Sequence, residues 1–467
     1  MAFDRRNRLP LFLLALLAGL LVSLAIAARA APRLVEVSPG PDSPHVPTGS
    51  PIVLTFNRPM DSASVEARLH ITPAVPGMLA WEGTQLTFRP DQAWPAGTTV
   101  TVRLAAGARS VLVLPLLASS EWSFTVGAPR LAYLWPAGGP AELYARTADG
   151  SQTEQLTSSA YGVVDFEVSA DGRRVLYAAA RADGGVDLWL LEPGRPAHTR
   201  LYACPFAHRC TAATLSPDGA WLAFEHLEPE AAGAGPRLAV GRIWLVNTAD
   251  GEALALSPEE RAASMPLWSS DGRLAYFDGG LRAIVVVEPG RPARTVATFA
   301  SELGPAGSWS PDGRYLLFPE IEFPEAGADG ATPVAPFYSH LLRAGIQTGE
   351  VVELWNAAIG MVEDSQPTYS PDGLWIAFAR RSLEPARWTL GRQLWLMRAD
   401  GGGARPLTDE PTHSHSAFAW SPDSTRLAYM RFNEADPTQA AEIWWTTIEA
   451  PAPLRLVIGG YLPQWLP

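Results

Sequence analysis

One short turn motif recurs six times in the C-terminal part of the chain, at intervals of 41 to 60 residues. It reads Ser-Pro-Asp-Gly or a close variant, and its aspartates are Asp171, Asp218, Asp271, Asp312, Asp372 and Asp423. Proline presets φ at the second turn position, aspartate bonds to nearby backbone amides, and glycine accepts a positive φ. A turn that recurs at this interval predicts an array of equivalent hairpins. We interpret the aspartates as turn residues first, and a catalytic or calcium-binding role is the minor alternative.

Each turn is followed by an apolar strand and then by a second strand that ends in another turn. After Asp218, for example, the chain reads AWLAFEH and later RIWLVNTADG. Short strands at this spacing, with turn residues between them, predict four-stranded antiparallel blades. The aromatic residue before several turns, such as Trp268 or Trp309, is expected to pack between neighbouring blades.

The two ends of this array predict how it closes. Residues 130–157 supply three strands that lack an inner strand, whereas residues 460–466 resemble an inner strand without partners. Pairing the two segments makes one further blade and removes the exposed edges of an open ring. We therefore expect an all-β chain with a seven-bladed β-propeller over residues 129–467, closed by the C-terminal strand. Six blades is the alternative, if one weak repeat is an insertion.

A separate module precedes the repeats, over residues 31–127. It contains short β-rich segments at 51–56, 86–88, 98–104 and 122–126, with turn residues between them. This pattern predicts a β-sandwich. Residues 111–117, VLVLPLL, are uniformly apolar. We expect them to form a packed strand, because apolar segments usually find a core, and an exposed apolar patch is the alternative.

Both parts of the chain resemble known families. The runs SPIVLTFNRPMD, LTFRP, WPAGTTVTVRL and WSFTVG, in this order, are similar to a bacterial Ig-like domain of the surface-layer-associated type. The Ser-Pro-Asp-Gly units resemble the TolB-type propeller repeat, a relative of the WD-repeat propellers. The resemblance implies a ring-shaped binding scaffold of the cell envelope. It supplies no catalytic or partner-binding residue that can be matched to a position of this chain.

The N-terminus indicates the compartment. Arg5, Arg6 and Arg8 precede 20 residues, 9–28, that carry no charge. Residues 1–30 are therefore a signal peptide or a membrane anchor, and both alternatives stay open. The arginines keep the N-terminus in the cytoplasm in either case. We expect the protein outside the cytoplasm, either free in the periplasm or medium or anchored to the cytoplasmic membrane by residues 9–28.

Charge and cysteine content exclude several classes of protein. The formal net charge is −12 and the chain has no lysine, so it is a poor candidate for nucleic-acid binding, which needs excess cation. Cys204 and Cys210 are the only cysteines, and outside the cytoplasm we expect them to form a disulfide loop. Metal binding with His208, or by the pair His413 and His415, is the weaker alternative. No cofactor is expected.

Strand direction alternates within a blade, so the Ser-Pro-Asp-Gly turns share one face of the ring and the long insertions share the other. We call these the turn face and the loop face. Loops carry function on rigid scaffolds, which nominates the loop face for binding. Its acidic residues are Glu228, Glu230, Glu322, Glu325, Asp329, Glu363, Asp364, Asp409, Glu410 and Glu434. They form either a solvated rim or a surface that attracts a cationic partner or a divalent cation.

The motifs favour a binding or scaffold protein over an enzyme. The sequence has no G-x-S-x-G nucleophile elbow and no H-E-x-x-H zinc motif. An active site in the propeller channel, acting on glycans or peptides, is the alternative. We predict an exported envelope protein whose propeller presents loops to another envelope protein or an extracellular ligand, with the Ig-like module as a spacer.

Overall fold

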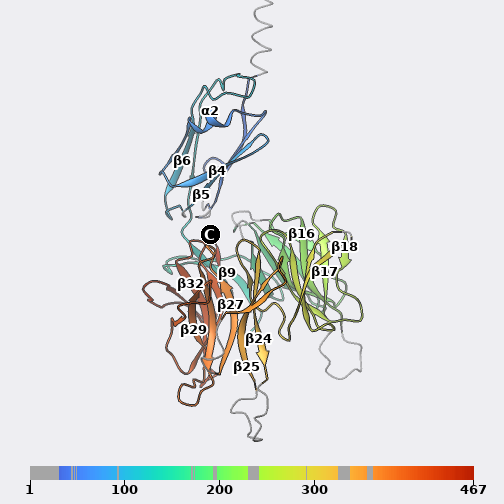
Figure 1. The fold of residues 1–467 in the computed structure, drawn as a ribbon. Helices are drawn as coiled ribbons and strands as arrows, with labels where there is room; N and C mark the ends of the chain where they lie inside the picture. The colour runs from blue at the N-terminus through green and yellow to red at the C-terminus, as the bar shows by residue number, and fades with distance from the viewer. Residues whose placement is uncertain are drawn as a thin grey trace, which may run out of the picture. The chain divides into compact units, whose positions relative to one another are not determined.

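The computed structural model describes residues 31–466 except for 44–45, 47, 49, 92–93, 170–171, 173, 193–196, 230–240, 291, 324–336 and 355–360. The predicted signal or anchor segment, residues 1–30, lies outside the described residues. Among the helices of the described part, none is long and apolar enough to cross a bilayer. The chain divides into two compact units, residues 1–128 and 129–467. Both are built of β-strands, so the predicted all-β class is confirmed (Figure 1).

The first unit is a sandwich of two antiparallel sheets with the strand orders β1-β2-β5-β4 and β3-β6-β7. The elements are β1 (Leu34–Ser38), β2 (Ile52–Phe56), α2 (Ser62–Glu66), β3 (Leu69–Thr72), β4 (Gly77–Glu82), β5 (Gln85–Pro90), β6 (Thr99–Leu104) and β7 (Ser120–Thr125). Alternate strand residues face the core, as for Ile52, Leu54 and Phe56 of β2. Trp94 is fully buried, and its indole nitrogen donates to the Ser50 carbonyl at 3.0 Å.

The apolar segment 111–117 does not form the packed strand that we expected. Its exposed side chains, at 60–71% of their surface, are Val111, Leu112, Val113 and Leu117. Leu116 alone of the aliphatic residues in this segment is buried. The expectation was wrong because β6 already has a neighbour on each edge, β3 and β7. The segment that connects β6 to β7 therefore has no free edge of β6 to join, and it forms a turn.

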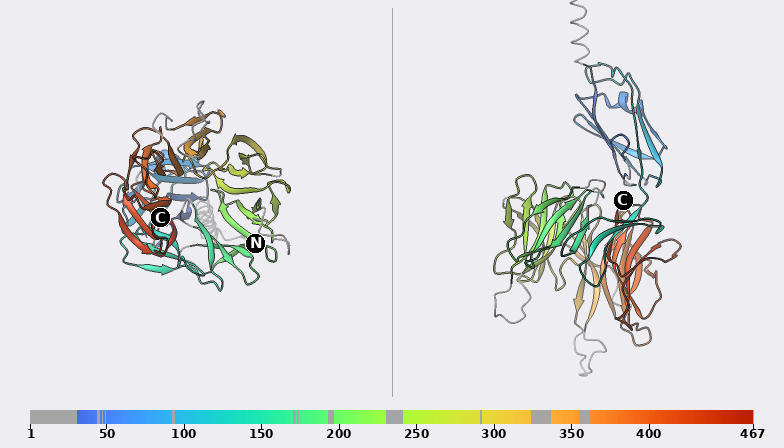
Figure 2. Two further views of the ribbon diagram at one scale, coloured as in Figure 1. Left: turned by 90° about the horizontal axis from the view of Figure 1, so that it is seen from below. Right: turned by 180° about the vertical axis from the view of Figure 1, so that it is seen from behind.

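The second unit is a seven-bladed β-propeller, as predicted, and Figure 2 shows its blades around one axis. Blade 1 contains β8 (Arg130–Trp135), β9 (Glu142–Thr147), β10 (Thr153–Gln155) and β35 (Tyr461–Leu466). Blade 2 contains β11 (Val163–Val168), β12 (Val175–Ala180), β13 (Val186–Leu191) and β14 (Thr199–Tyr202). Blade 3 contains β15 (Arg209–Leu215), β16 (Trp221–Leu227), β17 (Gly241–Asn247) and β18 (Ala253–Ala255).

The other four blades repeat the same meander. Blade 4 contains β19 (Ala263–Trp268), β20 (Leu274–Asp278), β21 (Ala283–Glu288) and β22 (Arg294–Ala300). Blade 5 contains β23 (Ser308–Trp309), β24 (Tyr315–Glu322), β25 (Tyr338–Gly345) and β26 (Val351–Glu353). Blade 6 contains β27 (Val362–Tyr369), β28 (Trp375–Ser382), β29 (Gln393–Arg398) and β30 (Arg405–Pro406). Blade 7 contains β31 (His413–Trp420), β32 (Arg426–Asn433), β33 (Glu442–Thr447) and β34 (Leu454–Ile458).

The C-terminal strand β35 is the inner strand of blade 1. It pairs antiparallel with β8, from Tyr461 opposite Leu134 to Leu466 opposite Arg130. Leu466 is 1% exposed and packs in the apolar cluster that blade 1 shares with blade 2. The last strand of the chain therefore completes the first blade and leaves no open edge at β8.

A bulge in several inner strands joins neighbouring blades. At the bulge the backbone takes a positive φ of 48–58°, in Ala212, Met265 and Ala417. A side chain of the preceding blade accepts a hydrogen bond from each of these N–H groups at 2.7–2.8 Å, and the acceptors are Asp165, Glu225 and Gln366, respectively. The bulge thus frees an N–H donor from the strand ladder, and a side chain of the preceding blade accepts its hydrogen bond.

The tryptophans that end several inner strands also bridge blades. Each indole N–H donates to a backbone carbonyl of the preceding inner strand at 3.0–3.2 Å, and the pairs are Trp268 with Thr214, Trp309 with Leu267, Trp420 with Thr368 and Trp465 with Ala419. The aromatic residues before the turns therefore pack between blades, as expected.

Candidate binding site

A cavity of about 710 Å³ lies between blades 1 and 2. We call it the interblade cleft. Blade 1 contributes residues 155–159, and blade 2 contributes Tyr177 of β12, Trp189 of β13 and His198. Tyr177 and Trp189 are opposite each other in the strand register, so their side chains lie on the same face of the sheet. Their rings stack with centroids 6.4 Å apart, and the Tyr177 hydroxyl is hydrogen-bonded to His198 Nδ1 at 2.8 Å.

Charged groups of blade 2 line the loop-face end of the cleft. Asp187 is 3% exposed, and Arg181 Nη1 donates to its Oδ1 at 2.6 Å. The Arg200 guanidinium lies 3.6 Å from the other oxygen of Asp187 and 5.9 Å from the Trp189 ring centroid. A buried carboxylate is thereby compensated by two cations, one of which lies over an aromatic face.

The side chains of the cleft can bind a ligand, but the Tyr177 hydroxyl is not activated as a nucleophile or base. Burial, followed by the charge of Glu142, raises the pKa of Tyr177 to about 12, so the hydroxyl keeps its proton at neutral pH. The opposite wall carries the Thr157 and Ser159 hydroxyls, which donate to Glu142 at 2.6 and 2.7 Å. Aromatic faces together with a few fixed polar groups suit a ligand held by stacking and hydrogen bonds.

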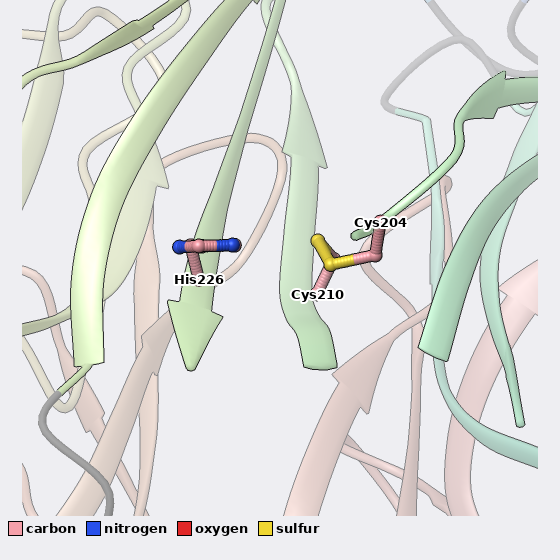
Figure 3. Close-up of side chains that lie close together, drawn as sticks. All are labelled: Cys204, Cys210 and His226. Carbon is pink, nitrogen blue, oxygen red and sulfur yellow. A yellow bond between two sulfur atoms is a disulfide. The ribbon is translucent and has the colours of Figure 1, made fainter. Parts of the chain in front are cut away.

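A disulfide loop adjoins the cleft. Cys204 and Cys210 are joined in a disulfide, and Figure 3 shows the bond at the start of β15. Arg181, which lines the cleft, donates to the carbonyl oxygens of Cys204 and Pro205 at 2.7 and 2.8 Å. Phe206, inside the loop, exposes 82% of its surface. The residues that line the cleft therefore also hold a short loop that presents an aromatic ring to solvent.

The cysteines are not available as metal ligands in this state. The two sulfur atoms and a ring nitrogen of His226 lie within 4.8 Å of one another (Figure 3). Because the sulfur atoms are bonded together, neither is the thiolate that zinc binds. His208 Nδ1 lies 3.1 Å from His226 Nε2. Burial, and then the neighbouring His208, lower the pKa of His226, which favours the neutral form of the His226 ring.

Two acids that we predicted for the loop face are buried in ion pairs on β27. Arg380 donates to both carboxylate oxygens of Asp364 at 2.6 Å. Arg381 and Arg392 both donate to Oε2 of Glu363. Asp364 is 1% and Glu363 6% exposed. These two carboxylates therefore join strands within blade 6, and their burial keeps them from contacting a binding partner.

Glu410 is held in a similar way in blade 7. Arg431 donates to both of its carboxylate oxygens at 2.7 and 2.8 Å, and His415 Nε2 lies 3.1 Å from Oε2. The His415 hydrogen bond, and then Arg431, hold the pKa of Glu410 at about 2. The other ring nitrogen of His415 is bonded to the Arg392 carbonyl. Both nitrogens have protein partners, so His413 and His415 do not form a pair of open metal ligands.

The remaining predicted acids differ in their surroundings. Glu434 accepts from Ser414 at 2.6 Å, and Glu228 is paired with Arg242 at 3.1 Å. Glu322 ends β24, and Asp409 is exposed. Glu230, Glu325 and Asp329 lie outside the described residues. Four of the seven described acids, namely Glu228, Glu363, Asp364 and Glu410, are thus paired with arginines, which weakens the case for a surface that attracts cations.

The repeat-turn aspartates accept hydrogen bonds inside their own turns. In the described turns the motif serine donates to the aspartate at 2.5–2.6 Å, and the acceptors are Asp218, Asp271, Asp312, Asp372 and Asp423. The bond from Ser216 is the main reason why the pKa of Asp218 is lowered. Asp171 lies outside the described residues. These aspartates organise the hairpins.

A second group of acids lies on the inner strand of blade 2, toward the central axis. Glu167 lines a cavity of about 300 Å³ on the turn face, together with residues of blades 3 to 5. Burial raises the pKa of Glu167 to about 7 and that of Asp165 to about 6. The Thr214 hydroxyl donates to Glu167 at 3.0 Å. A carboxyl with a pKa near neutrality in a cavity is a candidate acid or base.

The residues of the interblade cleft were not singled out by sequence reasoning. Tyr177 and Trp189 lie in two segments, RRVLYAA and VDLWLLEPG, that predict adjacent strands of blade 2. Two aromatic residues on paired strands are a signal that could have found them. Which gap between blades is left open, however, depends on the packing of blade 1, and no local pattern encodes it.

The comparisons with known proteins match the two units separately. Residues 28–126 match the model of the bacterial Ig-like domain family, so the first predicted resemblance is confirmed. The chain is 25% identical over 231 residues to a curated relative, "Uncharacterized peptidase YuxL" of Bacillus subtilis (strain 168). That match covers 48% of this chain and 30% of the relative's length.

Several solved structures resemble the chain in fold. TolB from Acinetobacter baumannii is 14% identical with a TM-score of 0.43, over 86% of this chain and 83% of TolB. The β-propeller domain of the Trilobed protease from Pyrococcus furiosus is 12% identical with a TM-score of 0.45, over 78% of this chain and 93% of that domain. The family match and the strand pairing together define the architecture: a bacterial Ig-like domain at residues 28–126, followed by a seven-bladed propeller.

Proposed function

We propose that the protein is an exported binding protein of the cell envelope. In this proposal the propeller holds an extended segment of another envelope protein in the interblade cleft, and the Ig-like domain is the spacer between membrane and propeller. The apolar segment 9–28 behind three arginines supports export. No enzymatic step is needed for this role.

One observation carries the proposal. The interblade cleft of about 710 Å³ combines the Trp189 and Tyr177 rings with fixed donors and acceptors. Next to it lies Phe206, which is 82% exposed on a loop closed by a disulfide. An exposed aromatic residue on a preorganised loop is the kind of group that carries binding energy at protein interfaces.

A site-specific photocrosslinker tests this proposal in the intact chain. We expect benzoylphenylalanine in place of Phe206 to give a discrete adduct with an envelope protein. The substitution Trp189→Ala should reduce the adduct yield at Phe206 about tenfold, because truncating a central aromatic contact weakens binding by that order.

Leu374 provides the matched control. It is 62% exposed, and it follows the Asp372 turn, so it lies on the turn face. The same crosslinker at Leu374 should give no adduct. Equal adducts at both positions, or no adduct at Phe206, would refute binding at the loop face.

The second candidate function is catalysis in the channel. The observation that favours it is Glu167, whose pKa is about 7 at the wall of a cavity. In this alternative Glu167 transfers a proton to or from a glycan or peptide in the channel. The intact protein is incubated with a glycan or peptide library, and hydrolysis or elimination is measured. A reaction that is lost in the Glu167→Gln variant would favour this alternative over the binding role.

A further inference from the structure

The turn between β6 and β7 presents an apolar tip to solvent. Val111, Leu112 and Val113, which we call the apolar tip, expose 60%, 71% and 66% of their surface. The Val113 N–H donates to the Ser110 carbonyl at 2.8 Å, which closes a turn. Val113 has a φ of 64°, a left-handed conformation that is unfavourable for a β-branched residue. A defined turn therefore holds three aliphatic side chains away from the core.

This tip lies at the end of the Ig-like unit where the described chain begins. The Val111 N–H donates to the Pro59 carbonyl at 3.3 Å. Asn57 lies two residues before Pro59, and its side-chain amide donates to the Ala31 carbonyl at 3.4 Å. Only two residues separate Ala31 from the uncharged segment 9–28. In Figure 1 the same end of the unit carries helix α2.

The charges around the tip suit a lipid surface. Arg58 and Arg109 flank it, and Arg109 is exposed. One exposed acid, Asp61, lies beside them, because its N–H donates to the Arg109 carbonyl at 2.9 Å and its carboxylate accepts from the Ser64 N–H at the start of α2 at 2.7 Å. The two arginines outnumber this acid. Exposed aliphatic side chains bordered by arginines are typical of segments that enter the interface of an anionic bilayer.

We propose that the apolar tip inserts into the outer interface of the membrane to which residues 9–28 anchor the chain. Three side chains bury too little apolar surface for lasting attachment on their own, so the contact is reversible. An adjacent anchor raises the effective concentration of the tip at the bilayer, which makes the weak contact effective. The second contact would fix the end of the Ig-like unit against the lipid. This inference rests on the membrane attachment in the proposed function, with residues 9–28 retained as the anchor, and it does not depend on the interblade cleft.

Environment-sensitive fluorescence of the full chain in nanodiscs tests the insertion. The discs contain phosphatidylglycerol and phosphatidylethanolamine, and each holds one copy of the chain. A nitrobenzoxadiazole probe on Leu112→Cys should emit at shorter wavelength than in water, and lipids with a nitroxide near the head group should quench it. The native cysteines do not react with the probe because they form a disulfide.

Met78→Cys is the matched control. Met78 is 68% exposed on β4. The turn between β4 and β5 lies toward the tip, because the Thr84 carbonyl accepts from the Phe56 N–H, three residues before Pro59. Met78 pairs with Arg89 at the other end of these two strands. A probe there should report water and no quenching. Adding Val111→Asp and Val113→Asp to the Leu112→Cys chain should abolish the quenching without changing the circular dichroism spectrum.

Two results would overturn the proposal. The first is a probe at Leu112 that reports water as the Met78 probe does. The second is a spectral shift that appears only when two copies share a disc, which would assign the apolar tip to a contact between copies of the chain.

Discussion

At the scale of single residues, the surroundings of each carboxyl decide its role. Glu410 contacts Arg431 and His415, and its pKa is held at about 2. Glu167 is half-buried near Asp165 with the Thr214 hydroxyl as its hydrogen-bond donor, and desolvation raises its pKa to about 7. The first carboxylate contributes to folding in its charged form, whereas the second is stable in the fold as a neutral acid.

Glu167 therefore predicts how stability depends on pH. Because its pKa in the folded protein lies above the ordinary glutamate value of 4.5, the folded state holds the proton more tightly than the unfolded state. The resulting stability is fully present below pH 4.5 and is lost as the pH rises through 7. Relative to Glu167→Gln, we expect the free energy of unfolding of the natural protein to fall by up to about 3 kcal/mol across this range.

Urea unfolding of both proteins between pH 4 and 8 measures the difference. The control is Glu228→Gln, which makes the same change at an exposed acid paired with Arg242; its curve should follow that of the natural protein. Parallel curves for the natural protein and Glu167→Gln would contradict the assignment of a raised pKa.

At the scale of elements, buried ion pairs join strands within a blade. Asp364 of β27 and Arg380 of β28 are register partners, and both are almost completely buried. The Arg380 guanidinium also lies 5.2 Å from the Trp395 ring centroid on β29. Three consecutive strands of blade 6 are thereby held by one polar contact. Asp364 is one of the acids that the sequence analysis predicted for the binding surface on the loop face.

Removing one partner of this pair should be far more harmful than removing both. We expect Asp364→Ala to lower the free energy of unfolding by about 3–5 kcal/mol, because it leaves the Arg380 charge buried without its partner. The double variant Asp364→Leu with Arg380→Met should regain most of this loss, since apolar side chains of similar volume need no compensation. Chemical denaturation of the single and double variants measures both values.

The exposed pair of Glu228 and Arg242 is the comparison on the same face. Glu228→Ala should cost less than about 1 kcal/mol, as exposed ion pairs do. Equal losses for Glu228→Ala and Asp364→Ala would show that burial does not set the contribution of these acids.

At the scale of the whole molecule, the ring depends on a contact between its two ends. The strand β35 pairs with β8, more than 320 residues earlier in the chain. Gln464 also bonds to the Val168 N–H and the Phe166 carbonyl of blade 2, and Trp465 bonds to Ala419 of blade 7. One strand therefore connects blade 1 to both of its neighbours.

Deleting residues 460–467 should destabilise the propeller strongly. The deletion exposes the edge of β8 and removes the buried Trp465 and Leu466 side chains. We expect the propeller transition to fall by about 10 °C or more, as followed by near-ultraviolet circular dichroism. A truncated chain that melts with the full-length protein would contradict ring closure.

Two substitutions separate packing from strand length. Trp465→Ala should reproduce part of the loss, because Trp465 is 5% exposed. Leu462→Ala in the same strand should have little effect, because Leu462 is 37% exposed. Similar melting temperatures for the two variants would point to a role for the backbone alone.

Local chemistry in the sequence was enough to predict the architecture. The Ser-Pro-Asp-Gly motif or its variant in each repeat encodes a turn within four residues, and an apolar strand follows each turn. The number of blades and the role of residues 460–466 followed from counting strands. Such features depend on contacts between residues near in sequence, or on a local pattern that recurs in every repeat.

The tertiary structure decided which residues meet across those repeats. Residues 111–117 read as a strand, yet β6 had no free edge, so the segment became an exposed turn. Glu363 and Asp364 read as surface acids, yet arginines of adjoining strands and loops neutralise them. Tyr177 and Trp189 lie in segments that the sequence predicts only as strands, and an opening between blades 1 and 2 places both rings in a cleft. Edge occupancy, charge pairing and interblade gaps arise between segments distant in sequence, and for that reason only the folded chain determines them.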